Sequence, residues 1–405
     1  MLKSNIRGFH IPVFLCYYIY MIIGINASAA LKQPRTGVEE YCYQVIKHLT
    51  MLPEARAHRF FLYISKSDPN DPNFHPNYPN KIFDFEVPKN FKIKELFWPF
   101  PMWTQLRLAS EMLFNKPDTL FIPVHILPRF HPKNSVVTIH GLEYEYFPEY
   151  YPFWFRNYLR FSTKYAVRYA RKIIAVSENT KRDLVKLYGA QESGVEVIHH
   201  GVEIQNVNIK MRNNPLRQSS SEASNVKFKI EKPYLFYVGR IELKKNIFGI
   251  LEAYRILKEK YKIPHELVLA GVPGFGYEKI KPIIHDSKFI IHELGYISEG
   301  EKQQLLANAD IFLFPSFYEG FGLPILEAQA SGVPVVSSNV SSVPEIAGNS
   351  ALLVDPKNPE QIAQAVYKII DDKALRDKLI ELGFENVKRF SWEKCAKETL
   401  KILLE

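Results

Sequence analysis

The stretch FPSFYEGFGLPILEAQASG, residues 314–332, decides the fold of this 405-residue sequence. The apolar run Ile311–Phe314 predicts a buried strand, and Pro324 begins a predicted helix because proline is favoured at the first helical position. Between them, Gly320 and Gly322 let the backbone approach a ligand closely. The free amides at the start of the helix favour an anion. The stretch therefore predicts a strand, a loop and a helix that together bind a phosphate-like group.

Two carboxylates accompany this anion site. Glu319 lies in the predicted loop, and Glu327 follows about one turn into the predicted helix. A carboxylate beside a phosphate site is useful when it binds hydroxyl groups, so a sugar or a ribose is the expected partner. A glycine-rich turn with two solvated glutamates is the alternative interpretation.

A second motif, YLFYVGRIELKKN at residues 234–246, supplies positive charge. The predicted strand ends at Gly239, and Arg240 and Lys245 follow in the loop before the next helix. Two cations fixed at the carboxyl end of a strand can neutralise a diphosphate without a metal ion. They also stabilise the charge that develops on a leaving nucleotide. A solvated basic turn is the alternative, but two such motifs on neighbouring strands of one domain favour the diphosphate site.

The first half of the chain contributes two further candidate residues. In VVTIHGLEYEYFPEYYP, residues 136–152, His140 follows a predicted strand at the rim where ligands bind to parallel sheets. A histidine with a purely structural role is the alternative. In ALKQPRTGVEEY, residues 30–41, Gly37 opens a helix after a polar loop, so its backbone can approach a donor phosphate or an acceptor.

Short apolar runs rich in β-branched and aromatic residues alternate with segments of helical period along most of the chain. Their hydrophobicity is continuous rather than alternating, which indicates strands buried on both faces and parallel pairing through crossover helices. The chain is therefore predicted to be an α/β protein with two doubly wound, Rossmann-like domains. The predicted strands are Ile22–Asn26, Phe60–Ser65, Thr119–Pro123, Ser135–Ile139, Lys172–Val176, Val195–Ile198, Tyr234–Val238, Glu266–Ala270, Phe289–His292, Ile311–Phe314, Val333–Ser337 and Ala351–Val354.

The expected domain boundaries follow from changes in composition. Residues 21–202 form the first domain and residues 232–390 the second, joined by a linker at residues 203–231 that is rich in asparagine, serine and lysine. Within the first domain, Asp68–Asn80 is a loop rich in proline and asparagine. A final helix, residues 391–405, begins with a serine N-cap.

Residues 1–20 allow two interpretations. The uncharged run Phe9–Ala27 follows two cations and resembles a signal peptide. Alternatively, MIIGINAS from Met21 begins a buried strand, and residues 1–20 are an extension or a weakly membrane-contacting tail. We favour the strand because the run is shorter than a membrane span and contains a histidine and a proline.

The chain is basic, with a formal net charge of +9. This charge suggests a polyanionic partner, either a phospholipid surface or an anionic substrate. Nucleic acid is not expected, because no helix-turn-helix, zinc-finger or RNP-like pattern accompanies the charge. The three cysteines lack the spacing of a disulfide framework or a zinc site, which fits a reducing, cytoplasmic environment. We expect neither a metal ion nor a bound cofactor.

The predicted helix Phe153–Arg171 combines cations with aromatic residues. Arg156, Arg160, Lys164 and Arg168 recur every fourth residue. Such a helix can lie on an anionic bilayer, here at the inner face of the membrane. An ordinary surface helix with a solvated cationic face is the alternative.

Together these motifs resemble the retaining glycosyltransferases of family 4, which have the GT-B architecture. The resemblance covers nearly the whole chain from Met21, and it is strongest in the second half, through VGRIELKKN, LAGVPGFGYEKI, LGYISEGE, the two-glutamate segment and SSVPEIAGNSALLVDP. In the first half, GINASAALKQPRTGVEEY resembles the family's opening strand and glycine loop, and IIAVSENTKRDLVKLYG with HHGVE resembles the end of its first domain. The resemblance implies two Rossmann-like domains that face a central cleft, with the C-terminal helix crossing back to the first.

The resemblance also implies a role for each candidate residue. Arg240 and Lys245, with Gly239, would hold the donor diphosphate. Glu327 would bind the ribose, and His140 would reach across the cleft to the donor sugar. Glu319 would hold the sugar and the β-phosphate together with the loop backbone of Gly320, Phe321, Gly322 and Leu323. Glu319 and His140 are the expected catalytic residues, in a reaction that retains the anomeric configuration.

The segments GYEKI, FPSFYEGFGLP and SNVSSVPE resemble the bacterial mannosyltransferase branch. This implies GDP-mannose as the donor and a glycan or lipid-linked saccharide as the acceptor, in the synthesis of a cell-surface polysaccharide or a lipopolysaccharide O-antigen. UDP-glucose and UDP-N-acetylglucosamine remain open as donors. A non-catalytic nucleotide-sugar-binding protein is the alternative from another class.

Overall fold

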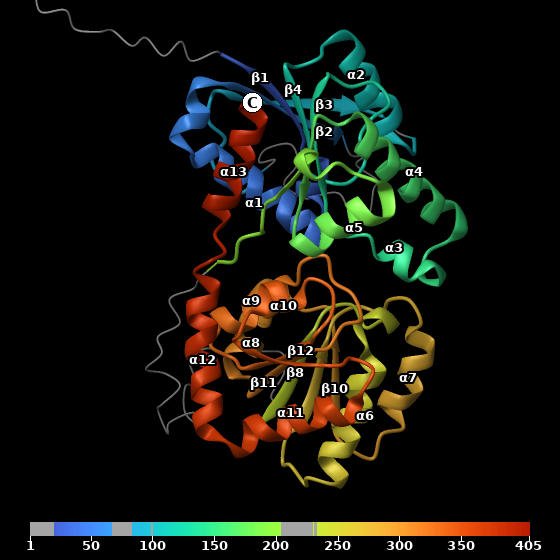
Figure 1. The fold of residues 1–405 in the computed structure, drawn as a ribbon, viewed down its shortest axis with the longest axis vertical. Helices are drawn as coiled ribbons and strands as arrows, with labels where there is room; N and C mark the ends of the chain where they lie inside the picture. The colour runs from blue at the N-terminus through green and yellow to red at the C-terminus, as the bar shows by residue number, and fades with distance from the viewer. Residues whose placement is uncertain (1–19, 67–82, 99, 204–229, 231–232) are drawn as a thin grey trace, which may run out of the picture.

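The computed structural model describes residues 20–66, 83–98, 100–203, 230 and 233–405. Two parallel sheets lie one above the other along the longest axis of the molecule (Figure 1). This arrangement confirms the predicted fold class of two doubly wound, Rossmann-like domains. The predicted loop Asp68–Asn80 lies outside the described residues, as do residues 1–19 and most of the predicted linker.

The first domain is built on a seven-stranded sheet in the order β3-β2-β1-β4-β5-β6-β7. The buried run IIGIN forms β1, and Gly24 at its centre pairs with Phe61 on one side and Leu120 on the other. The strands are β1 (Ile22–Asn26), β2 (Arg59–Lys66), β3 (Phe91–Phe97), β4 (Thr119–Ile122), β5 (Asn134–Ile139), β6 (Lys172–Ala175) and β7 (Val195–Val197).

The second domain is built on a six-stranded sheet in the order β10-β9-β8-β11-β12-β13. The strand order reverses direction next to β8 and β11, so the two predicted donor motifs lie at a switch point, where ligands bind in open parallel sheets. The strands are β8 (Tyr234–Val238), β9 (Glu266–Ala270), β10 (Ile291–Gly295), β11 (Ile311–Phe314), β12 (Val335–Ser338) and β13 (Ala351–Val354).

Helices cover both faces of each sheet, as parallel strands require. In the first domain they are α1 (Gly37–Met51), α2 (Ala109–Phe114), α3 (Glu143–Tyr146), α4 (Phe153–Tyr169) and α5 (Glu178–Tyr188). The remaining helices are α6 (Ile247–Glu259), α7 (Tyr277–His285), α8 (Glu299–Asn308), α9 (Leu323–Ala330), α10 (Val343–Ala347), α11 (Pro359–Asp371), α12 (Lys373–Val387) and α13 (Trp392–Leu404).

The structure differs from the sequence prediction mainly at the edges of the sheets. Strand β3 was not predicted, because its sequence FKIKELF lies at an edge of the sheet and interrupts its apolar residues with charged ones, of which Lys92 and Glu95 are exposed. The strand expected at Phe289–His292 is β10, shifted toward Gly295. Strand β12 begins after Pro334, and α9 begins at Leu323, one residue before Pro324.

The chain returns to the first domain at its last helix. In Figure 1, α12 runs along the second domain, and α13 lies beside α1 in the first. Gly201 and Trp392 cross at close range, since a Cβ built on Gly201 would lie 2.1 Å from Trp392 N. Ser391 caps α13 by accepting a hydrogen bond from Lys394 N at 3.3 Å, as predicted. The buried face of α13 completes the core between α1 and the first sheet.

We expect Leu400→Ala to destabilise the first domain. Leu400 is 2% exposed and belongs to this core. Removing its side chain leaves a cavity that costs about 2–5 kcal/mol. All four tryptophans of the chain (Trp98, Trp103, Trp154 and Trp392) lie in segments packed with the first domain, so urea unfolding followed by tryptophan fluorescence measures its stability.

Lys401→Ala is the matched control, because Lys401 is the exposed neighbour on the same helix. It should leave the unfolding midpoint near that of the wild type. Equal midpoints for Leu400→Ala and the wild type would show that α13 does not stabilise this domain.

Candidate active site

Two helix N-termini, one from each domain, converge at the predicted anion site. In the second domain, Gly322 has a φ of +112°, a conformation that suits glycine, and the chain enters α9 at Leu323. In the first domain, α1 begins at Gly37, and a Cβ built there would lie 3.9 Å from Leu323 Cδ1. Each helix start carries partial positive charge. Gly37, Gly322 and Leu323 therefore frame a region between the domains that suits an anion.

An ion pair joins the two motifs of the second domain. Lys245 Nζ lies 2.6 Å from Glu319 Oε1, and both side chains are largely buried. The ammonium also lies 5.3 Å from the centre of the Phe314 ring. An ammonium binds phosphate oxygens and a carboxylate binds hydroxyl groups, so a sugar diphosphate offers a partner to each member of this pair.

Asn246 holds the two motif loops together. Its Nδ2 donates hydrogen bonds to Pro315 O at 3.0 Å and to Pro356 O at 2.6 Å. Its Oδ1 accepts a hydrogen bond from Gly249 N at 3.2 Å and so caps α6. Sequence reasoning assigned Asn246 no role, although an asparagine directly before a helical segment is a recognisable N-cap signal.

Gly239 and Arg240 lie at the end of β8. The Gly239 carbonyl packs so tightly that a Cβ built on Gly271 would lie 1.8 Å from its oxygen. Arg240 is exposed, and among the described residues none forms a hydrogen bond or an ion pair with its guanidinium. Within the same ranges, no group of three or more histidine, cysteine or acidic side chains is placed to hold a metal ion. Metal independence stays a prediction.

Glu327 forms its ion pair with α8. Its Oε1 lies 2.7 Å from Lys302 Nζ, and Glu299 Oε2 lies 2.9 Å from the same ammonium. Although burial favours a neutral amine, these two carboxylates raise the pKa of Lys302 above its usual value. Sequence reasoning missed Lys302, which lies far from Glu327 along the chain. The structure thus places Glu327 about one helical turn beyond the site, with a cation already beside it.

His140 lies at the carboxyl end of β5 with its ring buried. Its Nε2 donates a hydrogen bond to Pro123 O at 2.7 Å, while Nδ1 is buried and has no partner among the described residues. Burial, followed by the nearby His125, lowers the pKa of His140 to about 3. The ring is therefore a neutral group that can accept a hydrogen bond at Nδ1 but cannot act as a general acid near neutral pH.

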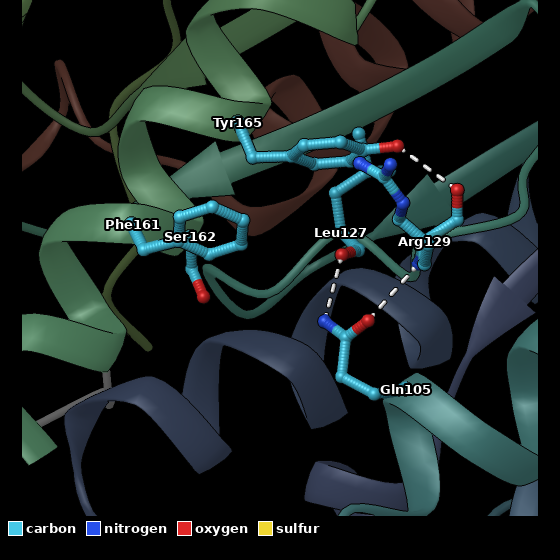
Figure 2. A pocket seen from close by; sticks show the side chains of 6 residues that line it. All are labelled: Gln105, Leu127, Arg129, Phe161, Ser162 and Tyr165. Atoms are coloured by element: carbon cyan, nitrogen blue, oxygen red, sulfur yellow. Dashed lines mark hydrogen bonds between the residues drawn. The ribbon is translucent and has the colours of Figure 1, made fainter.

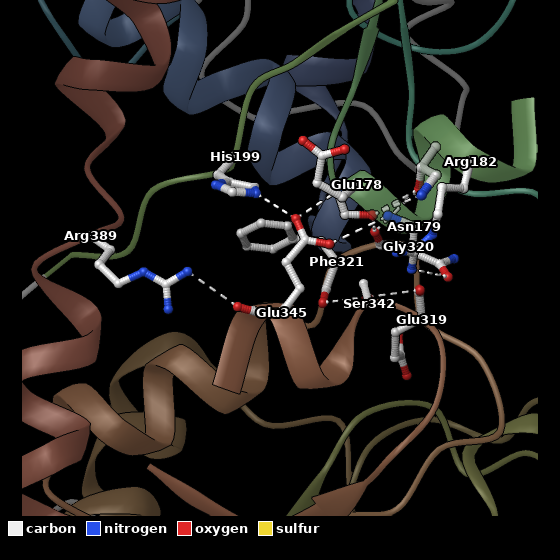
Figure 3. Close-up of polar contacts among 12 residues, drawn as sticks. Glu178, Asn179, Arg182, His199, Glu319, Gly320, Phe321, Ser342, Glu345 and Arg389 are labelled. Carbon is white, nitrogen blue, oxygen red and sulfur yellow. Dashed lines mark hydrogen bonds and ion pairs between the residues drawn. The ribbon is translucent and has the colours of Figure 1, made fainter. Parts of the chain in front are cut away.

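The backbone of His140 meets the loop that carries Glu319. A Cβ built on Gly320 would lie only 1.5 Å from His140 O, so the two domains touch here through backbone atoms. On the other side of the loop, Ser342 Oγ lies 2.9 Å from Glu319 O and 2.8 Å from Phe321 O (Figure 3). The structure therefore places the backbone of His140 against the loop that carries Glu319.

A second cation of the basic motif crosses to the first domain. Lys244 Nζ lies 3.8 Å from Glu143 Oε1 and 3.6 Å from Glu242 Oε1. Burial is the largest influence on Glu143 and opposes its charge. Lys244, a backbone hydrogen bond, His125 and the Tyr151 hydroxyl together outweigh burial, so the pKa of this carboxyl is lowered. Sequence reasoning selected Lys245 and left Lys244 out, because adjacent lysines give no signal of the direction in which each points.

The comparisons with known proteins agree with this architecture. The model of Glycosyltransferase Family 4 matches residues 35–206, and that of Glycosyl transferases group 1 matches residues 220–385. O-antigen chain mannosyltransferase B of Escherichia coli is 28% identical over 388 residues, which cover 93% of this chain and 98% of that protein.

Two solved structures share the fold. Sucrose-phosphate synthase from Thermosynechococcus elongatus superposes with a TM-score of 0.69 at 18% identity, covering 94% of this chain and 97% of the other. HepE of Anabaena in complex with UDP-glucose superposes with a TM-score of 0.66 at 17% identity, covering 94% of this chain and all of the other.

Two Rossmann-like domains, matched by two glycosyltransferase models, define a glycosyltransferase of the GT-B type. The chain belongs to glycosyltransferase family 4 and resembles the bacterial mannosyltransferases within it. The recognition made from the sequence motifs is thus confirmed, and the protein is an enzyme.

We expect the protein to lose stability as the pH falls from 7 to 5. An unfolded histidine has a pKa near 6.5, whereas that of folded His140 is about 3. Between these values the unfolded state binds more protons than the folded state, so the free energy of unfolding falls as the pH falls. His140 alone contributes on the order of 2 kcal/mol over this interval. Burial also lowers the pKa values of His125 and His200, which adds to the effect.

Thermal unfolding at pH 7, 6 and 5 measures this dependence. His140→Gln keeps a donor for Pro123 O but does not titrate, so its melting temperature should depend less on pH. His285→Gln, at an exposed position of α7, is the matched control and should retain the wild-type dependence. An equally steep dependence in His140→Gln would contradict the assignment.

Proposed function

We propose that this enzyme is a retaining, metal-independent hexosyltransferase that moves mannose from GDP-mannose to a glycan or lipid-linked saccharide. The process would be the synthesis of a cell-surface polysaccharide or a lipopolysaccharide O-antigen. The observation that supports it best is the Lys245–Glu319 pair beside two converging helix N-termini, because it combines groups for a diphosphate with a group for a sugar. The choice of mannose rests on the similarity to the Escherichia coli O-antigen mannosyltransferase along 98% of its length.

Donor binding would separate the ion pair. The donor diphosphate would take the Lys245 ammonium and the first amides of α9, while Arg240 adds a second cation from the end of β8. The Glu319 carboxylate would then accept hydrogen bonds from hydroxyl groups of the sugar. Gly37 at the start of α1 lets the first domain approach the same phosphates.

In the transfer, the bond between C1 of the sugar and the β-phosphate oxygen breaks. A new bond from C1 to the acceptor oxygen forms on the same face, and the acceptor proton passes to the departing phosphate oxygen. Negative charge grows on the nucleoside diphosphate, where Lys245, Arg240 and the α9 amides stabilise it. The contact between the domains excludes water and so protects the donor from hydrolysis.

His140 and Glu327 would have supporting roles. The His140 ring is neutral and its Nε2–H binds Pro123 O, so Nδ1 is its free acceptor. Because Nδ1 is buried, it would accept a hydrogen bond from a sugar hydroxyl only after the loop around it moves as the donor binds. Glu327 would bind the ribose hydroxyls, with Lys302 holding its carboxylate ionised and oriented.

Other donors fit the same site. UDP-glucose and UDP-N-acetylglucosamine are the competing donors, and HepE, which shares the fold, was solved with UDP-glucose. The alternative of another class, a non-catalytic nucleotide-sugar-binding protein, does not agree with the match to glycosyltransferase models in both halves of the chain.

An anionic membrane surface is the proposed macromolecular partner, contacted at its cytoplasmic face. Helix α4 exposes Trp154 (83%) and Phe161 (63%), which share a face because they lie seven residues apart. Lys164 and Arg168 are exposed beside them, and the helix contains no acidic residue. Aromatic rings that insert near headgroups and cations that meet anionic lipids are the features of interfacial helices.

Figure 2 shows that Phe161 also lines a hollow on this side of the first domain. Arg129 lines the opposite side of this hollow and adds a further cation. Its backbone is fixed by a hydrogen bond that Tyr165 Oη donates to Arg129 O at 2.9 Å. Among the described helices, none is both long and apolar enough to cross a bilayer.

A donor screen with Glu319→Gln tests the enzymatic proposal. GDP-mannose at ~100 times its dissociation constant should add about 2.7 kcal/mol to the stability of the wild type, seen as a thermal shift. Glu319→Gln should lower kcat by about 10²–10³-fold, because it removes the charge beside the reacting sugar. A radiolabelled transfer assay with a membrane extract as the acceptor source measures turnover.

Glu278→Gln, exposed on α7, is the matched control and should retain wild-type turnover. A chelator should leave turnover unchanged if the transfer needs no metal ion. A thermal shift with UDP-glucose but not with GDP-mannose would show that UDP-glucose is the donor. Full turnover by Glu319→Gln would contradict the catalytic role of Glu319.

The membrane contact predicts weaker vesicle binding when the aromatic face is lost. Trp154→Ser combined with Phe161→Ser should bind vesicles of phosphatidylglycerol and phosphatidylcholine on the order of 10-fold more weakly than the wild type. Tyr296→Ser removes an exposed aromatic residue from the second domain and should bind normally. Cosedimentation measures binding, and equal binding of wild type and double variant would refute the proposal.

A further inference from the structure

Helix α5 of the first domain binds the residues on both sides of Glu319. Tyr318 Oη donates a hydrogen bond to Asp183 Oδ2 at 2.8 Å. Gly320 O accepts a hydrogen bond from Ser177 Oγ at 2.7 Å. Glu319 lies between Tyr318 and Gly320 in the sequence. Its two neighbours are thus both hydrogen-bonded to the first domain.

Asp183 is a buried carboxylate, only 6% exposed. Besides Tyr318 Oη, it accepts hydrogen bonds from Tyr146 Oη at 2.5 Å and from Asn179 Nδ2 at 3.1 Å. These three donors are neutral, so hydrogen bonds rather than a cation offset the cost of burying the charge. A carboxylate satisfied in this way fixes the geometry of the groups that donate to it.

Tyr318 connects Asp183 to the loop that contains Glu319. Its hydroxyl oxygen also accepts a hydrogen bond from Leu142 N at 3.1 Å, directly after the His140–Gly141 segment that Gly320 touches. Its ring stacks on that of Tyr146, with 5.1 Å between the centroids. The hydroxyl is therefore fully used, and the side chain is fixed by the first domain.

The Gly320 carbonyl is fixed by the N-terminus of α5. Thr180 Oγ1 donates a second hydrogen bond to it, at 3.3 Å. Ser177, Thr180 and Asp183 recur at three-residue spacing, so they lie along one side of the helix. All three contact Tyr318 or Gly320, which makes this side of α5 a continuous binding face for the loop.

Glu345 closes the same contact from the second domain. Its Oε1 accepts a hydrogen bond from Glu178 N at 2.9 Å, and its Oε2 accepts one from Asn179 N at 3.4 Å, so it binds the first two amides of α5. His199 Nε2 lies 2.7 Å from Oε1 (Figure 3). Glu345 belongs to α10, and Ser342, which binds the loop, is the N-cap of the same helix. Helix α5 and the loop are therefore both bound to α10.

We propose that Asp183, Ser177 and Thr180 are positioning residues that set the Glu319 carboxylate for transfer. The proposal rests on the function proposed above, because it takes Glu319 as the group that acts on the donor. The first domain then has a task beyond binding the acceptor: its contact with the loop places the reacting carboxylate of the other domain. Transfer should occur only while α5 holds the loop.

A double-mutant cycle tests this. Asp183→Asn and Tyr318→Phe should each lower kcat on the order of 100-fold, since small misplacements of a reacting group have such effects. The donor KM should change by less than about 3-fold, because Lys245 and the α9 amides stay in place. The double variant should lose little more than the worse single variant, because both remove one interaction.

The matched controls are Asp377→Asn and Tyr296→Phe, at exposed positions of the second domain, and both should retain the wild-type kcat. Hydrogen exchange of the amides at residues 316–322 provides a readout independent of activity. Their protection should fall in both α5-contact variants, while protection of β8 and β11 stays unchanged. Tyr318→Phe suffices for this readout should Asp183→Asn fail to fold.

The outcomes separate the two proposals. If the wild type transfers no sugar, the proposed function fails, and the exchange data still report whether α5 fixes the loop. If the wild type is active, an unchanged kcat in both variants overturns the positioning role. Multiplicative losses in the double variant, with unchanged protection of the amides at residues 316–322, would overturn it as well.

Discussion

The close backbone contact at Gly320 is the constraint on which the rest of the site depends. No side chain fits there, because His140 O occupies the space that a Cβ would need. The absence of a side chain lets the loop of the second domain lie against the end of β5 and against the start of α5. The helix N-termini at Gly37 and Leu323 are brought together by the same contact. The candidate site is therefore formed where the two domains meet, and neither domain contains it alone.

The charges of the site are arranged in pairs that a ligand can rearrange. Lys245 faces Glu319, whereas its neighbour Lys244 faces Glu143 in the first domain. The first pair lies where a diphosphate and a sugar would enter, and the second crosses the boundary between the domains. The imidazole of His140, at the end of β5, stays neutral because burial disfavours its charged form. A nucleotide sugar thus meets cations for its phosphates and neutral or anionic acceptors for its hydroxyl groups.

Much of the fold and of the candidate site could be predicted from the sequence, because the strands and the loop motifs of the second domain are recognisable from short stretches of sequence. Buried parallel strands are continuous apolar runs, and the loop after β11 contains its glycines and its carboxylate within a few residues. The edge strand β3 was missed because its exposed face carries charges. Asp183 and Lys302 were missed for another reason: each acts on a residue far away in the sequence, and a polar residue on a helix gives no sign of the partner that buries it. Periodicity identifies the element but not the contact.

Helix α13 has a consequence for how the molecule is made. Its buried face belongs to the core of the first domain, although the whole second domain separates the two along the chain. During synthesis, the first domain emerges early with a strip of its interior uncovered, and that strip is closed only when the residues after Ser391 have left the ribosome. The second domain is contiguous and has no such delay. A chimaera that exchanges first domains between relatives must therefore carry two separate pieces of sequence, one from each end of the chain.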